Sequence, residues 1–239
     1  MCLNEYLTGK TMQVKLLEYT HNPLMTVYTA ARTCYSKYAP DKIHSKKIPN
    51  INLVNSVIQM GHHSVLEHVS MTFAISGISR ACSHQLVRHR IASYSQQSQR
   101  YVEFKNGVID YVVPASIKKG SVLETTFAEY LATATDFYQF LLKNSVTAED
   151  ARFVLPNACS TNIVMTVNAR ELIEMCKVRL CSTAQWEIRG MFNLIRKSVK
   201  SNKELKFIAK YLLPKCDWLK FCNEGKRSCG KYPTTEDGV

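Results

Sequence analysis

A dense set of hydrogen-bonding side chains lies in the segment from Arg88 to Tyr101. Its fourteen residues include three Arg, one His, three Ser and three Gln, with few apolar positions. Guanidinium groups hold phosphate or carboxylate bidentately and keep their charge, while Ser and Gln can pair with amide and carbonyl groups of a nucleobase or a flavin ring. On composition alone, an anion site and a basic loop without a ligand are about equally good interpretations.

The overall charge also points to anionic partners. The 239 residues include 31 Lys and Arg against 19 Asp and Glu, a formal net charge of +12. Such an excess favours nucleotides, phosphorylated cofactors, nucleic acid or an anionic membrane face. Between Arg196 and Lys231 there are eleven Lys and Arg against three Asp and Glu, so most of the excess lies away from the arginine-rich segment. The nine glycines contain no Gly-x-Gly, which excludes the dinucleotide fingerprint and the P-loop, so side chains must do much of the phosphate binding.

Several protein classes are excluded by simple patterns. No apolar run approaches the roughly 20 residues of a membrane-spanning helix, and residues 1–13 lack a signal-peptide pattern. The nine cysteines contain no Cys-x-x-Cys pair and indicate reduced thiols in a cytoplasmic protein. His62, His63 and His68 lack zincin spacing, and the tail cysteines are too widely spaced for a zinc knuckle. We therefore expect no metal and no membrane partner.

Hydrophobic periodicity predicts the elements that must position this segment. Strands are expected at residues 14–19, at 69–76 before a break at Gly77, and at 108–113 before Pro114. Helices are expected over residues 24–34, 50–61, 78–90 and 127–141, from Thr147 to Pro156, from Asn168 through Arg179, and from Ser182 through Ile195. Because helices and strands follow in mixed order without βαβ repetition, the sequence predicts a single α+β (mixed α/β) domain.

The order of the residues is more informative than their composition. Arg-His-Arg-x-x-Ser-x-x-x-x-Ser-x-Arg, the motif of flavin-dependent thymidylate synthases, is matched at Arg88, His89, Arg90, Ser93, Ser98 and Arg100. Segments 61–68, 151–156, 166–170 and 184–188 are similar to further family segments in the same order. The resemblance covers roughly residues 12–215. It implies an N-terminal extension of residues 1–11, a family domain of residues 12–215 and a basic, cysteine-containing tail of residues 216–239.

The resemblance implies a reductive methylation of dUMP to dTMP. In this family 5,10-methylenetetrahydrofolate donates the carbon, NADPH supplies the reducing equivalents, and bound FAD relays the hydride. The resemblance also implies a central mixed sheet flanked by helices, and a homotetramer whose active sites lie where subunits meet. We therefore expect these small molecules and further copies of the chain as partners, and no nucleic acid.

The site residues implied by the resemblance fall into two binding groups. Residues expected to bind dUMP are Gln85, Arg88, Gln96, Gln97, Ser98, Gln99, Arg100, Arg152 and Arg179. Residues expected to bind FAD are His62, Ser64, Arg88, His89, Arg90, Gln96, Asn168, Arg170 and Glu174. Arg179 is the expected catalytic residue, because a cation against the uracil ring favours an ionised N3 and activates the base. Glu174 departs from the family pattern, which tends to a neutral or basic residue there.

Other interpretations stand beside this one. A basic chain with an Arg/Gln/Ser loop could bind a phosphate backbone without turnover, although no helix-turn-helix, zinc-finger or RNP pattern is recognisable. The same flavin chemistry could also act on a related nucleotide. Asn168 could serve only as a helix N-cap, and Arg179 could simply extend to solvent from an apolar helix face.

Overall fold

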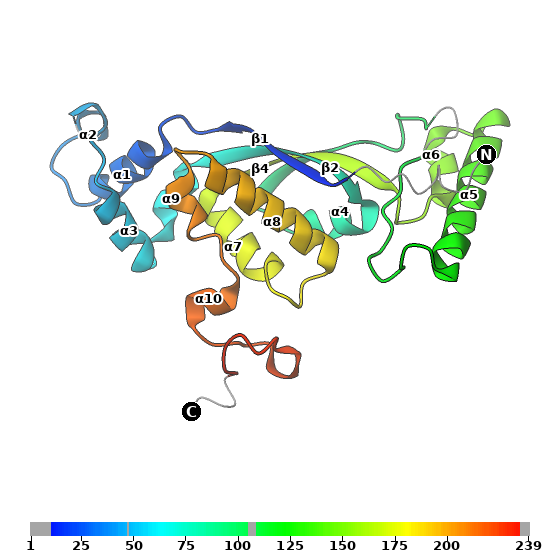
Figure 1. Cartoon of the computed structure of the whole chain (residues 1–239). Coiled ribbons are helices and arrows are strands. Elements are labelled where there is room, and N and C mark those ends of the chain that lie inside the picture. Colours follow the sequence, from blue (N-terminus) through cyan, green and yellow to red (C-terminus); the bar gives the residue numbers. More distant parts are fainter. Residues whose placement is uncertain (1–10, 47, 105–108, 235–239) are drawn as a thin grey trace. The chain divides into compact units, whose positions relative to one another are not determined.

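The computed structural model describes residues 11–46, 48–104 and 109–234 (Figure 1). The chain forms two compact units, one with residues 74–88 and 94–164 and the other with residues 14–73, 89–93 and 165–234. Strands β2, β3 and β4 each contribute residues to both units, so these are parts of one α+β domain, as expected. Residues 1–10 of the expected N-terminal extension lie outside the described residues.

A four-stranded sheet with helices beside it forms the centre of the fold. Its strand order is β1 (Gln13–Tyr19), β2 (Ser70–Ser79), β4 (Ser160–Asn168) and β3 (Ala92–Gln96). Thr20 N donates to Ser70 O, Arg80 N to Cys159 O, Ala169 N to Val69 O and Gln97 N to Asn162 O. In each neighbouring pair the end of one strand therefore meets the start of the other, and the sheet is antiparallel rather than mixed.

Strand β2 continues past the glycine expected to end it. Gly77 has φ +71° inside β2, and the strand runs on to Ser79. Only glycine adopts this backbone conformation at little cost, so the residue bends the strand instead of terminating it. Helix α4 (Arg80–Leu86) follows directly, and the side chain of Ser79 caps it by accepting from Cys82 N at 3.0 Å.

Two strands were not expected from the sequence. In β4, Thr161, Ile163, Met165 and Val167 are buried on one face, which is the alternation of a half-buried strand. In β3, Ala92 and Tyr94 are half-buried and alternate with the exposed Ser93 and Ser95, but the alternation covers only five residues and includes no branched aliphatic side chain. The local signal for β3 is therefore weak, and its pairing with β4 supports it. The arginine-rich segment thus contains a strand rather than only a loop.

The remaining elements of the first unit surround a separate apolar core. They are α5 (Val122–Lys143), α6 (Ala148–Ala151) and η4 (Arg152–Val154). The core contains Ile109, Tyr111, Leu131, Tyr138, Ala151 and Cys159. The prediction of a strand over residues 108–113 was wrong for the described part of that segment, because Tyr111 forms only a single isolated bridge with Cys159. Val108 lies outside the described residues.

The second unit holds the other helices. They are α1 (Pro23–Thr33), α2 (Pro40–Lys46), α3 (Ile51–Gln59), η2 (His63–His68), α7 (Ala169–Arg179), α8 (Trp186–Ser201), α9 (Lys206–Ala209), α10 (Lys215–Leu219) and η5 (Gly225–Arg227). Asn168 caps α7 by accepting from Glu171 N at 2.9 Å, as expected. Helix α8 begins after Gln185, whose side chain accepts from two backbone N–H groups, and so starts later than the expected Ser182.

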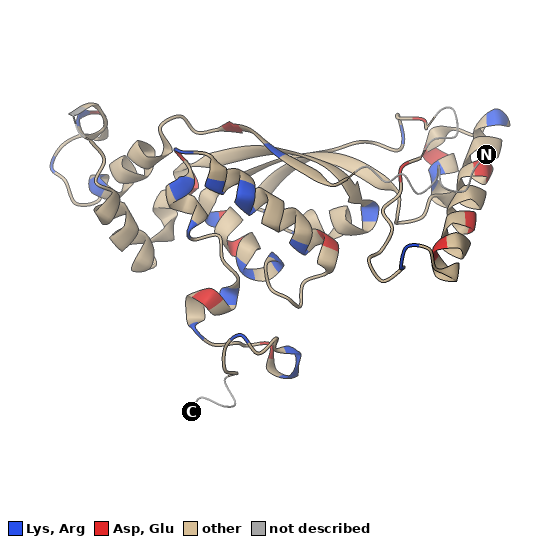
Figure 2. Ribbon diagram, viewed as in Figure 1, with Lys and Arg blue, Asp and Glu red and all other residues tan. Residues whose placement is uncertain are grey.

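Charge is unevenly distributed over the helices. Helix α5 carries Glu124, Glu129 and Asp136, whereas α8 and the segment after it are rich in Lys and Arg (Figure 2). Among the described residues, no helix combines the length and the apolar character needed to cross a membrane.

Candidate active site

Hydrogen bonds within the first unit hold the side chains of Gln96, the last residue of β3, and of Gln97, which follows it. Gln96 Nε2 donates to the hydroxyls of Ser83 at 3.0 Å and Thr161 at 3.2 Å. Gln97 Oε1 accepts from Asn162 Nδ2 at 2.8 Å. These contacts tie the segment to α4 and β4, so the orientations of the two glutamines are set by the fold.

The next residues of the motif lie at a hollow of about 250 Å³ in the same unit. Gln99 and Arg152, both expected to bind dUMP, line it together with Arg80, His84, Phe153, Leu155, Pro156 and Asn157. Gln99 Nε2 contacts the Cys159 sulfur at 3.5 Å. Burial raises the pKa of the Cys159 thiol to about 11, so very little of the nucleophilic thiolate is present at neutral pH.

Arg100 and Ser98 occupy the exposed end of the segment. Arg100 Nη2 forms an ion pair with Glu149 Oε2 at 2.8 Å, with both side chains about half exposed. The Ser98 hydroxyl accepts from Arg100 N at 3.1 Å and so fixes the local turn. Gln85 is half-buried on α4, and Arg88 is exposed two residues beyond that helix. The structure therefore brings Gln99 and Arg152 to one hollow, while Arg100 is paired with a glutamate.

In the second unit, the motif histidine meets the expected catalytic arginine. Arg179 Nε donates to His89 Nε2 at 2.9 Å, and His89 Nδ1 lies 3.7 Å from Glu171 Oε1. Burial, together with the charge of Arg179, lowers the pKa of His89 to about 4. The imidazole is therefore neutral at pH 7, accepts through Nε2 and carries its proton on Nδ1, toward Glu171.

The expected flavin residues of α7 are engaged in local contacts. Arg170 Nη1 forms an ion pair with Glu67, both half exposed. Glu174 forms an ion pair with Lys177 at 2.7 Å. The side-chain oxygen Oδ1 of Asn168 accepts the N-cap hydrogen bond from Glu171 N. The side-chain N–H groups of Asn168 take no part in that bond.

The remaining residues expected to bind the flavin, His62, Ser64 and Arg90, belong to the same unit, and the first two lie at the start of η2. Ser64 lines a hollow of about 680 Å³ together with Glu67, His68, His44, Thr26, Thr29 and Thr33. His62 and Arg90 are exposed. The residues around Gln99, expected to bind the nucleotide, and those around Ser64, expected to bind the flavin, thus belong to different units of the fold, each with its own hollow.

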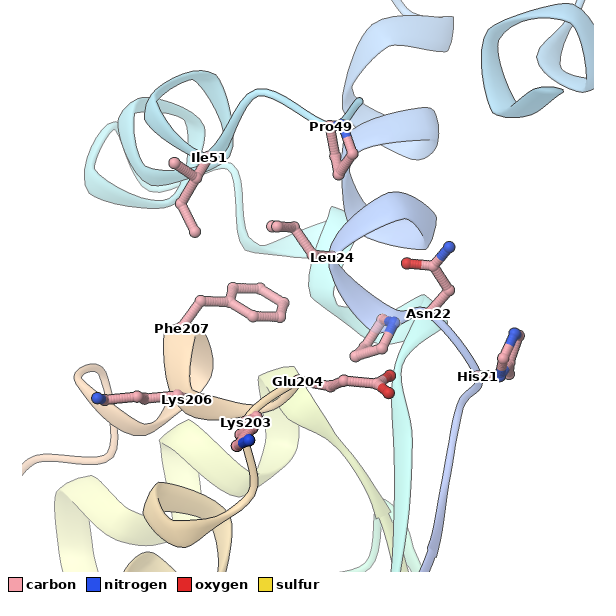
Figure 3. A pocket seen from close by; sticks show the side chains of 10 residues that line it. His21, Asn22, Leu24, Pro49, Ile51, Lys203, Glu204, Lys206 and Phe207 are labelled. Atoms are coloured by element: carbon pink, nitrogen blue, oxygen red, sulfur yellow. The ribbon is translucent and has the colours of Figure 1, made fainter. Parts of the chain in front are cut away.

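Another hollow, of about 650 Å³, lies away from all of the predicted site residues. Its apolar lining includes Leu24, Ile51 and Phe207, with Lys203 and Glu204 at its side (Figure 3). None of the residues expected to bind dUMP or FAD lines it. It therefore contributes nothing to the site described above.

Two residues at the hollow beside Gln99 were missed by sequence reasoning. Arg80 and His84 lie one helical turn apart on α4, so they share a face of that helix. Arg80, His84 and Arg88 follow one another at four-residue intervals, a helical spacing that was visible in the sequence and places basic side chains on one face. It was overlooked because the motif itself begins only at Arg88.

Fold and site together define an α+β protein in which arginine, glutamine and hydroxyl side chains of the motif and of later segments line surface hollows or lie beside them. A family model described as thymidylate synthase complementing protein matches residues 15–202, and the chain belongs to this family. It is similar to proteins named flavin-dependent thymidylate synthase from Geobacter sulfurreducens (43% identical over 92% of this chain and 94% of that protein), Clostridium tetani (40%, 93% and 96%) and Pyrococcus horikoshii (42%, 89% and 90%).

Proposed function

We propose that this protein is a flavin-dependent thymidylate synthase, which methylates dUMP reductively to dTMP. The single observation that carries the proposal is the hydrogen bond from Arg179 to His89, because it joins the motif histidine to the arginine that must act on the uracil ring. Methylenetetrahydrofolate is the carbon donor and NADPH the reductant. The names of the similar proteins and the family match support the same reaction.

Arg179 is the catalytic residue of this proposal. Its guanidinium keeps its positive charge at any working pH, and neutral His89 fixes its direction without cancelling that charge. A fixed cation beside the uracil ring stabilises negative charge as N3 ionises, and the ionised ring is richer in electrons at C5. C5 then becomes a better nucleophile toward the folate methylene group.

Residues of the first unit would hold the nucleotide. Gln99 and Arg152 line one hollow, which supports a joint role. Gln96 and Gln97 are oriented by the sheet, and Arg100 must exchange Glu149 for the ligand. Gln85, Arg88 and Ser98 complete the proposed set.

Residues of the second unit fit FAD by their chemistry. FAD carries a pyrophosphate, hydroxyl groups and a ring with amide-like edges; Arg170 supplies a cation, and Ser64 and neighbouring hydroxyls line a hollow large enough for part of it. Bound FAD would supply hydride transfer. His62, His89, Arg90 and Asn168 of this unit would orient the cofactor, together with Gln96 of the first unit. Glu174, a carboxylate paired with Lys177, fits an anionic cofactor least well of the set.

Assembly and compartment are further parts of the proposal. A homotetramer with active sites at subunit interfaces would let residues of different subunits complete one site. The family domain would span residues 12–215, followed by the tail of residues 216–239. The described cysteines are thiols rather than disulfides, which supports a reducing, cytoplasmic environment.

The deciding experiment is a dTMP-forming assay with FAD, NADPH and the folate each omitted in turn. We expect a protein that is yellow as purified or after FAD is added, and product only when the protein holds FAD and both NADPH and the folate are present. A protein that takes up no FAD refutes the proposal, and salt-dependent polynucleotide binding without turnover would favour the nucleic-acid alternative. Comparing dUMP, dCMP and UMP separates thymidylate synthesis from the same chemistry on a related nucleotide.

A further inference from the structure

Trp218 of α10 lies beyond the residues matched by the family model, yet its ring is packed within the second unit. The indole stacks on the ring of Tyr211, with centroids 5.8 Å apart, and meets the imidazole of His63 edge-on at 5.7 Å. Tyr211 is anchored in turn, because its hydroxyl donates to Asn55 Oδ1 at 3.2 Å. The indole N–H is buried and has no hydrogen-bond partner among the described residues, so ring contacts alone hold Trp218 in place.

Trp218 also contacts a cation, the ammonium group of Lys177 on α7. Lys177 Nζ lies 4.9 Å from the centroid of the indole ring, a distance at which an ammonium is attracted to the face of a tryptophan. The same Nζ donates to Glu174 Oε1 at 2.7 Å. The side chain of Lys177 is only 19% exposed, against 46% for Glu174. The lysine is therefore fixed between an indole and a carboxylate, whereas most surface lysines sample many rotamers.

Glu174 places a negative charge on the helix that also carries Arg170, the cation proposed for the cofactor. Its charge acts on neighbouring groups: burial raises the pKa of Glu171, and the charge of Glu174 raises that pKa further. A carboxylate so close to Arg170 would repel the pyrophosphate of FAD. The ion pair with Lys177 cancels this charge locally, and it can do so continuously only if the ammonium is held in place.

We propose that Trp218 is a positioning residue for the flavin site, which keeps Lys177 paired with Glu174 so that the carboxylate does not repel the cofactor. This inference rests on the proposed function, because the anion concerned is the pyrophosphate of FAD. Trp218 acts through Lys177 and needs no contact with the cofactor itself. The tail thereby takes part in FAD binding, although the family match ends at residue 202.

The test measures FAD affinity by fluorescence titration of the flavin-free full-length protein. Trp218→Leu removes the aromatic face and keeps an apolar side chain, Trp218→Phe keeps an aromatic face, and Lys177→Gln removes the cation. Each variant is made alone and together with Glu174→Gln, because a double-mutant cycle isolates the part of the effect that passes through the carboxylate. Leu219→Ala, which changes the exposed neighbour of Trp218 on α10, is the matched control. Circular dichroism checks that each variant is folded.

We expect Trp218→Leu and Lys177→Gln each to weaken FAD binding about three- to tenfold, the range of a partly buried cation–π contact. Combined with Glu174→Gln, the same replacements should weaken it less than about twofold. Trp218→Phe should stay near wild type, because the indole N–H makes no hydrogen bond that phenylalanine would lose. Leu219→Ala should bind FAD like wild type. Should Trp218→Leu fail to fold, Trp218→Met, a flexible apolar replacement, carries the test.

The outcomes separate this inference from the proposed function. Equal losses of affinity with Glu174 and with Glu174→Gln overturn the inference, because Trp218 would then act only by packing, for instance through His63, and Lys177 by direct contact with the cofactor. Wild-type affinity in Trp218→Leu overturns it as well, even in a protein that binds FAD and forms dTMP. A wild-type protein that takes up no FAD refutes the proposed function, and this inference with it.

Discussion

Arg179 on α7 donates a hydrogen bond of 2.9 Å to His89, a residue 90 positions earlier in the chain. The arginine cannot lose its charge, and the buried histidine is neutral, so the contact orients a cation without neutralising it. An isolated arginine on a helix would sample many rotamers. Here the imidazole restricts the guanidinium to one direction, as an electrostatic catalyst requires.

Replacing Arg179 tests its catalytic role directly. We expect Arg179→Ala to lower kcat for dTMP formation by about 10²–10³-fold, which is typical of removing one group that stabilises developing charge. FAD uptake, read from flavin absorbance, should be nearly unchanged. Equal kcat in wild type and Arg179→Ala would contradict the role of Arg179, whereas a colourless variant would indicate a role in cofactor binding instead.

Protonation of His89 should destabilise the protein in acid. Its pKa is lowered from 6.5 to about 4 in the folded state, so the unfolded chain binds a proton more readily between these values. The stability that this group contributes is complete above pH 6.5 and is lost as the pH falls toward 4. The neighbouring Glu171 has a raised pKa, again because of burial, and works in the opposite direction.

The pH dependence is measured by urea unfolding of wild type and His89→Gln between pH 4 and 7. Because Glu171 is present in both proteins, their difference isolates the histidine. We expect the free energy of unfolding to fall less steeply with acid in His89→Gln. His21→Gln, which removes an exposed histidine, is the matched control. Parallel pH profiles of wild type and His89→Gln would contradict the prediction.

The ion pair between Arg170 and Glu67 should compete with the flavin. Both side chains are about half exposed, and such pairs contribute up to about 1 kcal/mol. If Arg170 must leave Glu67 to bind the cofactor, Glu67→Gln should tighten FAD binding by up to about fivefold. Flavin fluorescence titration measures this. Glu224→Gln, which breaks the pair with Arg227 in the tail, is the control and should leave FAD affinity unchanged.

The sequence predicted the parts of the fold that have a local cause. Asn168 and Asn50 cap α7 and α3 by hydrogen bonds within three residues, and each helix begins directly after the asparagine at which the sequence predicted its start. Strand β3 has only a weak local signal, because just Ala92 and Tyr94 alternate with serines over five residues, and the strand pairs with β4. Gly77 is a second example of a feature that the local sequence does not determine. A glycine can end a strand or bend it, and pairing with neighbouring strands determines which of the two occurs.

The sequence predicted which residue types form the candidate site, but it did not predict which side chains each of them contacts. The motif spacing pointed to Gln99 and Arg100, but which of these faces a hollow and which faces a glutamate depends on α6 and η4, some fifty residues later. Arg80 lies outside the motif and enters the site because the antiparallel pairing of β2 with β4 brings the start of α4 beside Cys159. Contacts of this kind have no local pattern in the chain.

The core beneath the motif gives a final prediction on stability. Leu131 is fully buried and belongs to the same apolar core as Tyr111 and Cys159, whereas its neighbour Tyr130 is 54% exposed. Leu131→Ala leaves a cavity and should lower the free energy of unfolding by about 2–5 kcal/mol. Tyr130→Ala should change it by no more than about 0.5 kcal/mol. Urea unfolding followed by circular dichroism measures both, and equal midpoints for the two variants would show that α5 does not pack as described.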